Sequence, residues 1–424
     1  ATWNRYGTAK SDMIDAKASG EIMQLPAGPL AFAVGAEFRK ESGVDECIEA
    51  DCKNGFIDGT NVTGSSGKRN INSQYLELRA PAAKGLDITA AVRRDDYSTI
   101  NKDSVTPQVA IEYRPMKELL IRGVAGKGFK APTLFEAYQS KSESFNNGAT
   151  WADQRRCPVT KAREDCGSTQ VRNFRGGNVN LSPEKSKNVS LGTVVEVSKD
   201  FVFSLDWYRI DIEDTIGLPS VARVLAREAQ VGSSPLVVRS AASATDIALG
   251  IPGAIDYISL QYNNIGRTIV TGADAEAEYR ISTAEWGKFS FNTTLSYIDK
   301  YWQSPEPGAP LVQYAGTKDV PRFRATSGVK WMSGPFELTY AWRHVGTHRQ
   351  TYDDGSGMST ISPENYHDLA LNYSGIKNLK INFGVRNIFN RNPSFSNGDS
   401  QAYSYAFGDP RGRNFWMSVG YKLW

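Results

Sequence analysis

The stretch Leu379-Lys-Ile-Asn-Phe-Gly-Val-Arg386 alternates apolar and polar residues at every position. Successive side chains of a β-strand point to opposite faces, so this pattern predicts a strand with one apolar and one polar face. The last stretch of the chain, from Phe415 to Leu423, repeats the alternation. These two stretches predict antiparallel strands joined by the segment between them.

The same period of two recurs along the whole chain and predicts about fifteen strands. Their expected spans are 20–25, 29–41, 70–80, 86–96, 104–114, 117–127, 186–197, 200–212, 266–281, 287–301, 320–332, 335–346, 364–374, 378–389 and 413–424. Short connections alternate with mostly long ones, at about 43–69, 128–185, 213–265, 302–319, 347–363 and 390–412. Only the connection near 97–103 interrupts this alternation.

Alternating short and long connections indicate an up-and-down antiparallel sheet that keeps its short turns at one end. Outer-membrane β-barrels have this organisation, with short periplasmic turns and long extracellular loops. Charges gather on the polar face of single strands, for example Asp274, Glu276 and Arg280 on one strand. We therefore expect an all-β transmembrane barrel, with apolar side chains toward lipid and charged side chains toward the lumen. The long loop at 213–265 also contains a predicted short helix over 219–230.

The composition excludes several classes of protein. The chain has 424 residues, with 49 Lys and Arg against 46 Asp and Glu, a balance that argues against nucleic acid as a partner. No apolar run approaches the roughly 18 residues of a membrane-spanning helix. We expect neither an enzyme nor a cofactor, because no catalytic arrangement of Ser, His, Cys and Asp is recognisable.

The four cysteines form two close pairs, Cys47 with Cys52 and Cys157 with Cys166. Neither pair has the spacing of a zinc or redox site, and both lie in expected long loops. Two local disulfides in an oxidising compartment are favoured over free thiols. This interpretation agrees with long loops outside the cell.

Five motifs, in order along the chain, resemble those of TonB-dependent outer-membrane receptors. The first contains Phe129, Lys130, Ala131 and Pro132, and the second contains Asn178, Asn180, Leu181, Pro183 and Glu184. The other three are 205–212, 384–390 and 409–413. The resemblance extends from about residue 20 to the end of the chain.

The resemblance implies a 22-stranded barrel filled by an N-terminal plug that carries a TonB box. Residues 1–424 are then the C-terminal part of one barrel domain, and the plug, the TonB box and about seven strands are expected to lie outside this chain. It further implies uptake of a scarce solute (a siderophore, cobalamin, an oligosaccharide or a peptide) across the outer membrane of a Gram-negative bacterium. The TonB–ExbB–ExbD system would supply the energy, and the surrounding lipid would be a further partner.

Solute contacts are expected from aromatic and Arg residues in the long loops, because such residues commonly anchor recognition. The candidates are Tyr138, Trp151, Arg155, Arg156, Tyr257, Tyr262, Trp302, Arg349 and Tyr352. Loop packing is the competing interpretation for each of them. We expect no metal site, because His344 and His348 lie at a strand end rather than on a helix.

Other classes of function remain open at this point. One is a passive outer-membrane channel, and another is the barrel anchor of a surface assembly that binds partner proteins. A third is a secreted, soluble β-protein that binds carbohydrate through exposed aromatic residues.

Overall fold

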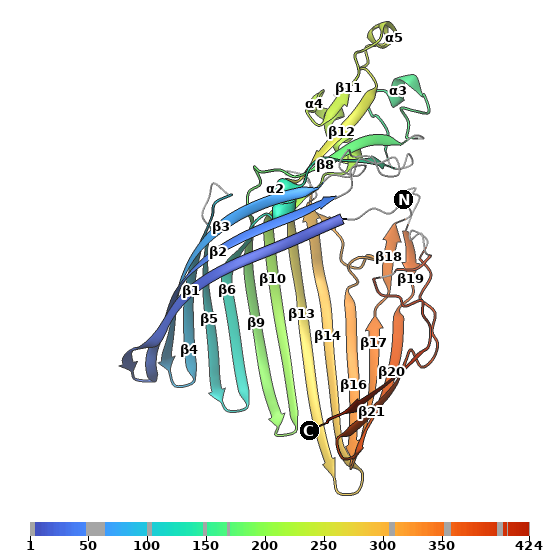
Figure 1. The fold of residues 1–424 in the computed structure, drawn as a ribbon. Coiled ribbons are helices and arrows are strands. Elements are labelled where there is room, and N and C mark those ends of the chain that lie inside the picture. Colours follow the sequence, from blue (N-terminus) through green and yellow to red (C-terminus); the bar gives the residue numbers. More distant parts are fainter. Residues whose placement is uncertain are drawn as a thin grey trace.

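The computed structural model describes residues 5–47, 64–99, 104–146, 151–167, 170–304, 310–351, 358–396, 402–404 and 406–423. One large antiparallel sheet dominates these residues (Figure 1). Its fifteen consecutive strands are β1 (Arg5–Leu25), β2 (Gly28–Cys47), β3 (Ser65–Ala83), β4 (Leu86–Tyr97), β5 (Ser104–Met116), β6 (Leu119–Lys130), β9 (Glu184–Ser198), β10 (Phe201–Gly217), β13 (Asn263–Thr283), β14 (Gly287–Ser304), β16 (Phe323–Ser333), β17 (Phe336–Val345), β20 (Glu364–Ile376), β21 (Leu379–Arg386) and β22 (Asn414–Tyr421). A short strand, β15 (Val312–Gln313), pairs with β14 beside this path.

Each strand of the large sheet pairs with its predecessor and its successor on the path, so the sheet is an up-and-down meander. This arrangement confirms the predicted all-β, antiparallel fold class. The short turns gather at one end, here called the turn end, and the long connections leave from the other, here called the loop end (Figure 1). In the described residues, β1 and β22 are the two edge strands.

The register places apolar side chains in continuous rows on one face of the sheet, here called the apolar face. One such row runs across seven strands: Ile111, Gly123, Leu191, Trp207, Ala273, Tyr297 and Phe323. Several of these side chains are exposed, with Leu191 at 58%. A row of exposed apolar side chains this wide has no covering layer in the described protein and requires an apolar surrounding.

The next row along the same strands lies on the opposite face, here called the charged face. It contains Glu112, Arg122, Gly192, Asp206, Asp274, Ser296 and Arg324. Arg122 donates two hydrogen bonds to Asp206, at 2.9 and 2.7 Å, across the intervening strand β9. Gly192 lies between them, and a Cβ there would meet Asp206, so glycine permits this contact.

Aromatic rings cluster on the apolar face near the turn end. Tyr279 packs edge-on against Phe201 and parallel to Phe291, with centroid separations of 5.8 and 6.4 Å. Phe383 and Phe415 form a similar stacked pair on the last two strands of the sheet. Such rings suit the boundary between lipid and water.

A smaller lobe rises from the loop end of the sheet (Figure 1). Its four-stranded sheet has the order β11 (Val237–Arg239), β12 (Ile255–Gln261), β8 (Val171–Gly176) and β7 (Ser142–Asn146). The lobe's helices are α3 (Cys157–Thr160), α4 (Val221–Val231) and α5 (Ala244–Ala248). Its strands therefore come from two different long loops of the barrel sheet.

The lobe has a core of its own, and α4 supplies much of it. Ser220 caps the helix through its side chain, and Gly232 ends it with a positive φ of 85°. Val221, Val224 and Leu225 face inward. They join Trp151, Val171, Val237, Ile258 and Leu260 in one buried apolar cluster. The helix predicted over 219–230 is thus confirmed, shifted by one or two residues.

Two further elements lie at the loop end. A hairpin of β18 (His348–Thr351) and β19 (Met358–Ile361) forms part of the connection between β17 and β20. The short helix α2 (Leu134–Tyr138) follows β6. In the described residues no helix is long and apolar enough to cross a membrane.

Candidate functional site

The first two motifs meet where β6 ends and β9 begins. Lys130 and Glu184 are cross-strand partners, with 3.1 Å between Nζ and Oε1. The same carboxylate oxygen accepts a hydrogen bond from the backbone N–H of Ile216 on β10. Phe129 packs edge-on against Tyr97. These residues therefore join four strands at the base of the lobe.

The helix α2 is held at this junction by a capping box. The Thr133 side chain accepts from the backbone N–H of Glu136, and the Glu136 carboxylate accepts from that of Thr133. This arrangement satisfies two backbone donors at the helix start. The Tyr138 ring lies over Gly67 of β3, where a Cβ would collide with it. Glycine at this position lets the helix lie against the sheet.

The residues of the second motif, 178–184, connect the lobe to β13 through hydrogen bonds. Asn178 donates through Nδ2 to the carbonyl of Tyr262 at 2.9 Å, and its Oδ1 accepts from the backbone N–H of Asn180. Leu181 is buried. The next residue, Ser182, exchanges two hydrogen bonds with the side chain of Asn264. The motif residues thus position the loops, and none of these contacts requires a solute.

A polar cleft of about 810 Å³ lies at the loop end of β2 and β3 and includes Tyr138. Its remaining lining residues are Lys40, Ser42, Val44, Ser66, Gly67, Lys68, Arg69, Asn70, Ser98 and Thr99. Three of them are cationic and none is a carboxylate. Arg69 is held by Glu41, at 2.7 Å, and by the carbonyl of Pro132. The arrangement suits a polar or anionic group.

A buried ion cluster organises the lobe around Arg239. Its guanidinium donates to Asp153 and to Glu228, with closest distances of 2.7 Å to each. It also donates to the carbonyl of Gly253 at 3.0 Å. Burial alone would lower the pKa of Arg239, but the hydrogen bonds to Glu228 and Asp153 outweigh it and raise the pKa above its usual value. The cluster links α4, β11 and the segment that precedes α3.

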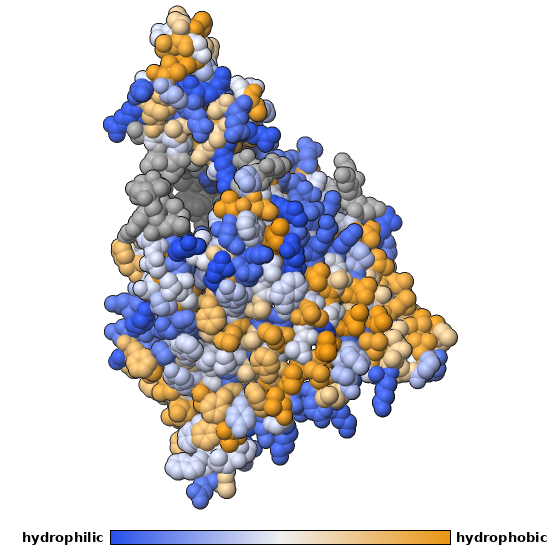
Figure 2. Space-filling view, turned by 180° about the vertical axis from the view of Figure 1, so that it is seen from behind, coloured by the Kyte–Doolittle hydropathy of each residue, from blue (hydrophilic) through white to orange (hydrophobic). Residues whose placement is uncertain are grey.

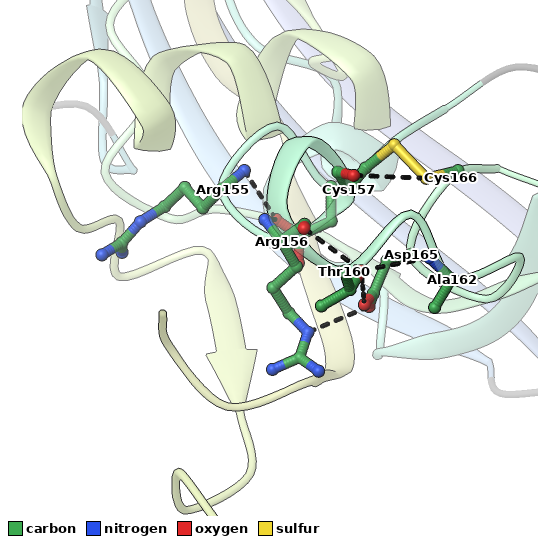
Figure 3. Close-up of a disulfide and its surroundings, with 8 residues drawn as sticks. Arg155, Arg156, Cys157, Thr160, Ala162, Asp165 and Cys166 are labelled. Carbon is green, nitrogen blue, oxygen red and sulfur yellow. Dashed lines mark hydrogen bonds and ion pairs between the residues drawn. A yellow bond between two sulfur atoms is a disulfide. The ribbon is translucent and has the colours of Figure 1, made fainter. Parts of the chain in front are cut away.

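Arg156 forms a second clamp beside the disulfide (Figure 3). Its side chain donates to Asp165 at 2.9 Å and to Asp246 of α5 at 2.8 Å. Thr160 also donates to Asp165, at 2.8 Å. Hydrogen bonds from Ser243, together with that from Arg156, lower the pKa of the Asp246 carboxyl. Arg156 is therefore fully engaged within the lobe.

Cys157 and Cys166 form the predicted disulfide, which closes the turn that follows α3 (Figure 3). Cys52 lies outside the described residues, so the Cys47–Cys52 bond stays a prediction.

Replacing Cys157 by serine should loosen this turn. Without the disulfide the unfolded turn regains conformational entropy. This lowers the free energy of opening the turn by about 2.5 kcal/mol. Amide hydrogen exchange over 153–166 measures the local opening, and Val159→Ser in the same turn is the matched control. Unchanged protection in Cys157→Ser, or equal loss in the control, would contradict this expectation.

Most of the predicted solute-contact residues lie in the lobe or near its base. Trp151 belongs to the buried core, and Arg155 donates to the carbonyl of Gly232. Tyr257 packs edge-on against Phe174, and Tyr262 against Phe135. Of the candidates in the described residues, only Tyr138 lines the cleft. The others have packing or pairing partners within the chain, and their role in solute contact stays a proposal.

The remaining candidates lie elsewhere. Trp302 is on β14 opposite Gln313 of β15. Arg349, on β18, exchanges backbone hydrogen bonds with Gly316 and Lys318. Tyr352 is outside the described residues. Within the described ranges no group of three His, Cys, Asp or Glu side chains could hold a metal ion.

The cationic part of the cleft, which is Lys40, Lys68 and Arg69, was not predicted from the sequence. These residues belong to β2 and β3, which continue beyond the predicted strand spans. The cross-strand pairing of Ser42 with Lys68 brings the two strands' residues together. A run of polar residues on both faces, as in 65–74, is the signal that could have indicated a strand rising above the membrane.

The large sheet has an apolar face and a charged face, and its long connections leave from one end. These features are those of the wall of an outer-membrane type of β-barrel. The family model described as "TonB dependent receptor-like, beta-barrel" matches residues 4–388. The chain therefore belongs to the TonB-dependent receptor β-barrel family, as the sequence motifs predicted. Barrels of this family reside in the outer membrane of Gram-negative bacteria. No curated protein matches the sequence.

Solved structures with the same fold include two receptors and one protein complex. The siderophore receptor PirA from Acinetobacter baumannii is 16% identical over 97% of this chain and 55% of its own, with a TM-score of 0.66. A mutant of the ferric enterobactin receptor PfeA from Pseudomonas aeruginosa is 17% identical over 98% of this chain and 54% of its own, with a TM-score of 0.68. The FpvAI–pyocin S2 complex contains a chain that is 14% identical over 98% of this chain and 50% of its own, with a TM-score of 0.61. The chain thus spans about half the length of these relatives.

Proposed function

We propose that this chain forms the C-terminal wall of a TonB-dependent outer-membrane transporter that takes up a scarce solute. The observation that carries the proposal is the pair of adjacent rows across the sheet, one apolar and one charged, in a chain of this family. The apolar face would meet lipid and the charged face would enclose a wet lumen.

Energy coupling is the part of the proposal that separates it from a passive channel. The transporter would work with the TonB–ExbB–ExbD system through a plug and a TonB box outside this chain. The Arg122–Asp206 pair and its row present fixed charges to the lumen, where a plug would find polar partners. No bond of the solute is made or broken in this scheme.

A ferric siderophore is our candidate for the solute. Among the structural relatives, PirA is described as a siderophore receptor and PfeA as a ferric enterobactin receptor.

Uptake of radiolabelled ferric siderophores by cells that carry the full-length protein tests the function. We expect uptake that a protonophore abolishes, because the transporter would draw its energy from the proton gradient. Uptake that persists without the proton gradient would instead support the passive channel.

A further inference from the structure

Part of the last long connection lies against the charged face at the loop end. The described residues of this connection, here called the strap, are 387–396, 402–404 and 406–413. Three alternate residues of β20, Glu364, Tyr366 and Asp368, each accept one backbone N–H of the strap, at 2.6, 3.1 and 2.8 Å. Glu364 continues the charged row of Arg324 through Val345 of β17. The strap therefore covers the upper part of the charged face.

Phe407 joins the strap to two further elements. Its ring centroid lies 5.0 Å from the guanidinium carbon of Arg324 on β16. This contact is a cation–π interaction. The ring of His348 on β18 packs edge-on against the same Phe407 ring, with 5.9 Å between the centroids. The strap is thus connected both to the barrel sheet and to the hairpin of β18 and β19.

His348 is buried at this contact with half of its hydrogen-bonding capacity unused. Its side chain is 1% exposed, and Nδ1 donates to the carbonyl of Gly346 at 3.0 Å. In the neutral ring Nε2 is then an acceptor, and within the described residues it has no partner. Three other buried atoms here lack a hydrogen bond as well: Glu364 Oε2, Arg391 Nε and Ser394 Oγ. A buried polar contact that is only partly satisfied is weaker than a fully paired one.

The charges around His348 offer no counter-ion for a protonated ring. The charged or titratable groups on the surrounding elements are Arg324 of β16, Arg343 of β17, Arg349 of β18, Glu364, Tyr366 and Asp368 of β20, Lys318 and Asp319 of the connection before β16, and Arg391, Tyr403, Asp409 and Arg411 of the strap. Asp368 and Asp409 are already held by arginines, at 3.1 and 2.8 Å. Within the described ranges no carboxylate lies within ion-pair distance of His348. The charged group that shares the Phe407 ring is the cation Arg324.

Protonation of His348 would therefore disfavour the closed strap. Histidine is the side chain that ordinarily gains a proton between about pH 8 and pH 5. A proton on Nε2 would create a buried charge without a partner, and such a charge is costly. The charge reaches water only when the strap leaves the hairpin. Figure 2 shows hydrophilic side chains between the apolar ones over the strands and the lobe, so the loop end lies in water and takes the pH of the medium.

We propose that the strap is a pH-operated cover of the upper lumen, with His348 as its switch. The neutral ring keeps the strap closed against β16, β18 and β20. As the pH falls toward 5, the protonated ring releases the strap, which uncovers the Tyr366 hydroxyl and the side of Arg324 that Phe407 covers. This proposal rests on the proposed orientation, with the charged face toward the lumen, and not on the identity of the solute.

Amide hydrogen exchange of the full-length protein in detergent, at pH 7 and pH 5, tests the switch. Protection factors remove the intrinsic pH dependence of exchange. We expect protection of the Ser394 and Asp409 amides to fall about tenfold from pH 7 to pH 5, because the unpaired charge favours the open strap. His348→Gln and His348→Phe take up no proton and should protect these amides equally at both pH values. His344→Gln, an outward-facing histidine bonded to Asn365, is the matched control and should keep the response.

The outcomes separate the switch from other causes. Equal protection of the unchanged protein at both pH values would overturn the proposal. A response that both His348 variants retain would do the same, as would one that His344→Gln abolishes. His348→Phe gives the result if His348→Gln loses protection at pH 7. Loss at pH 7 in both variants would show that the strap needs the imidazole for packing and would count against the switch. Absent solute uptake with this pH response intact would count against the transport proposal only.

Discussion

Replacing Arg239 by methionine should open the loop lobe at a cost of about 3 kcal/mol. Breaking a buried ion pair leaves charges without a partner, which typically costs 3–5 kcal/mol. Here the carboxylates of Asp153 and Glu228 would be left, exposed by only 1% and 2%. The lower end of the range applies because Arg155 lies 3.6 Å from Glu228 and offers partial compensation.

Amide hydrogen exchange over 151–176 and 218–262 measures this opening against exchange in the strands of the barrel sheet. Protection should fall about a hundredfold in the lobe and stay constant in β9 and β10. Arg227→Met, on the exposed side of the same helix as Glu228, is the matched control. Equal protection in Arg239→Met and the control would show that the cluster does not hold the lobe together.

Replacing Leu295 by arginine should cost about 2–4 kcal/mol of folding free energy in a bilayer. Leu295 lies in the middle of β14 on the apolar face, between Ala275 and Ala325. An arginine on the lipid face of a barrel costs this amount near the bilayer midplane. Reversible unfolding in lipid vesicles, followed by tryptophan fluorescence, measures the change.

Thr294→Arg provides the control in the adjacent residue. Thr294 lies on the charged face opposite Glu276, which could pair with the new guanidinium. We expect a change below about 0.5 kcal/mol there, as for a substitution into a wet lumen. Similar losses at both positions would mean that both faces are equally buried, as in a soluble sandwich.

The strands of the large sheet could be predicted because each has one apolar and one polar face over the span of a membrane. All fifteen predicted segments correspond to strands on the sheet's path. The first was predicted at 20–25 but extends from Arg5 to Leu25. Its first part, with Ser11, Asp12 and Asp15, has polar residues on both faces and so gives no period of two.

The lobe could not be predicted, because its structure depends on pairings between distant loops. Strand β12 pairs in parallel with β8, which is more than 80 residues earlier. Arg239 has no feature in the sequence that distinguishes it from other loop arginines, yet it forms the centre of the ion cluster. Conversely, Trp151 and Arg156 were predicted as solute contacts for their residue type, and their structural partners are in the lobe itself.

The structural partners of the motif at 409–413 could not be predicted from the sequence either. In the structure Arg411 donates two hydrogen bonds to the Asp409 carboxylate, which lower the pKa of Asp409 to about 2. The backbone N–H of Asp409 donates to the hydroxyl of Tyr366 on β20. The sequence identified the motif, but only the structure shows that it fastens the last long connection to a neighbouring strand.

The most direct test compares the surroundings of the two faces of a single strand, one expected in lipid and one in water. A nitroxide label at Leu205, on the apolar face of β10, and another at Ser204, on the charged face, can be compared in lipid vesicles by electron paramagnetic resonance. We predict that Leu205 collides mainly with dissolved oxygen and Ser204 mainly with a water-soluble nickel chelate. Free access of the nickel chelate to both labels would contradict the assignment of this sheet to a membrane-spanning barrel.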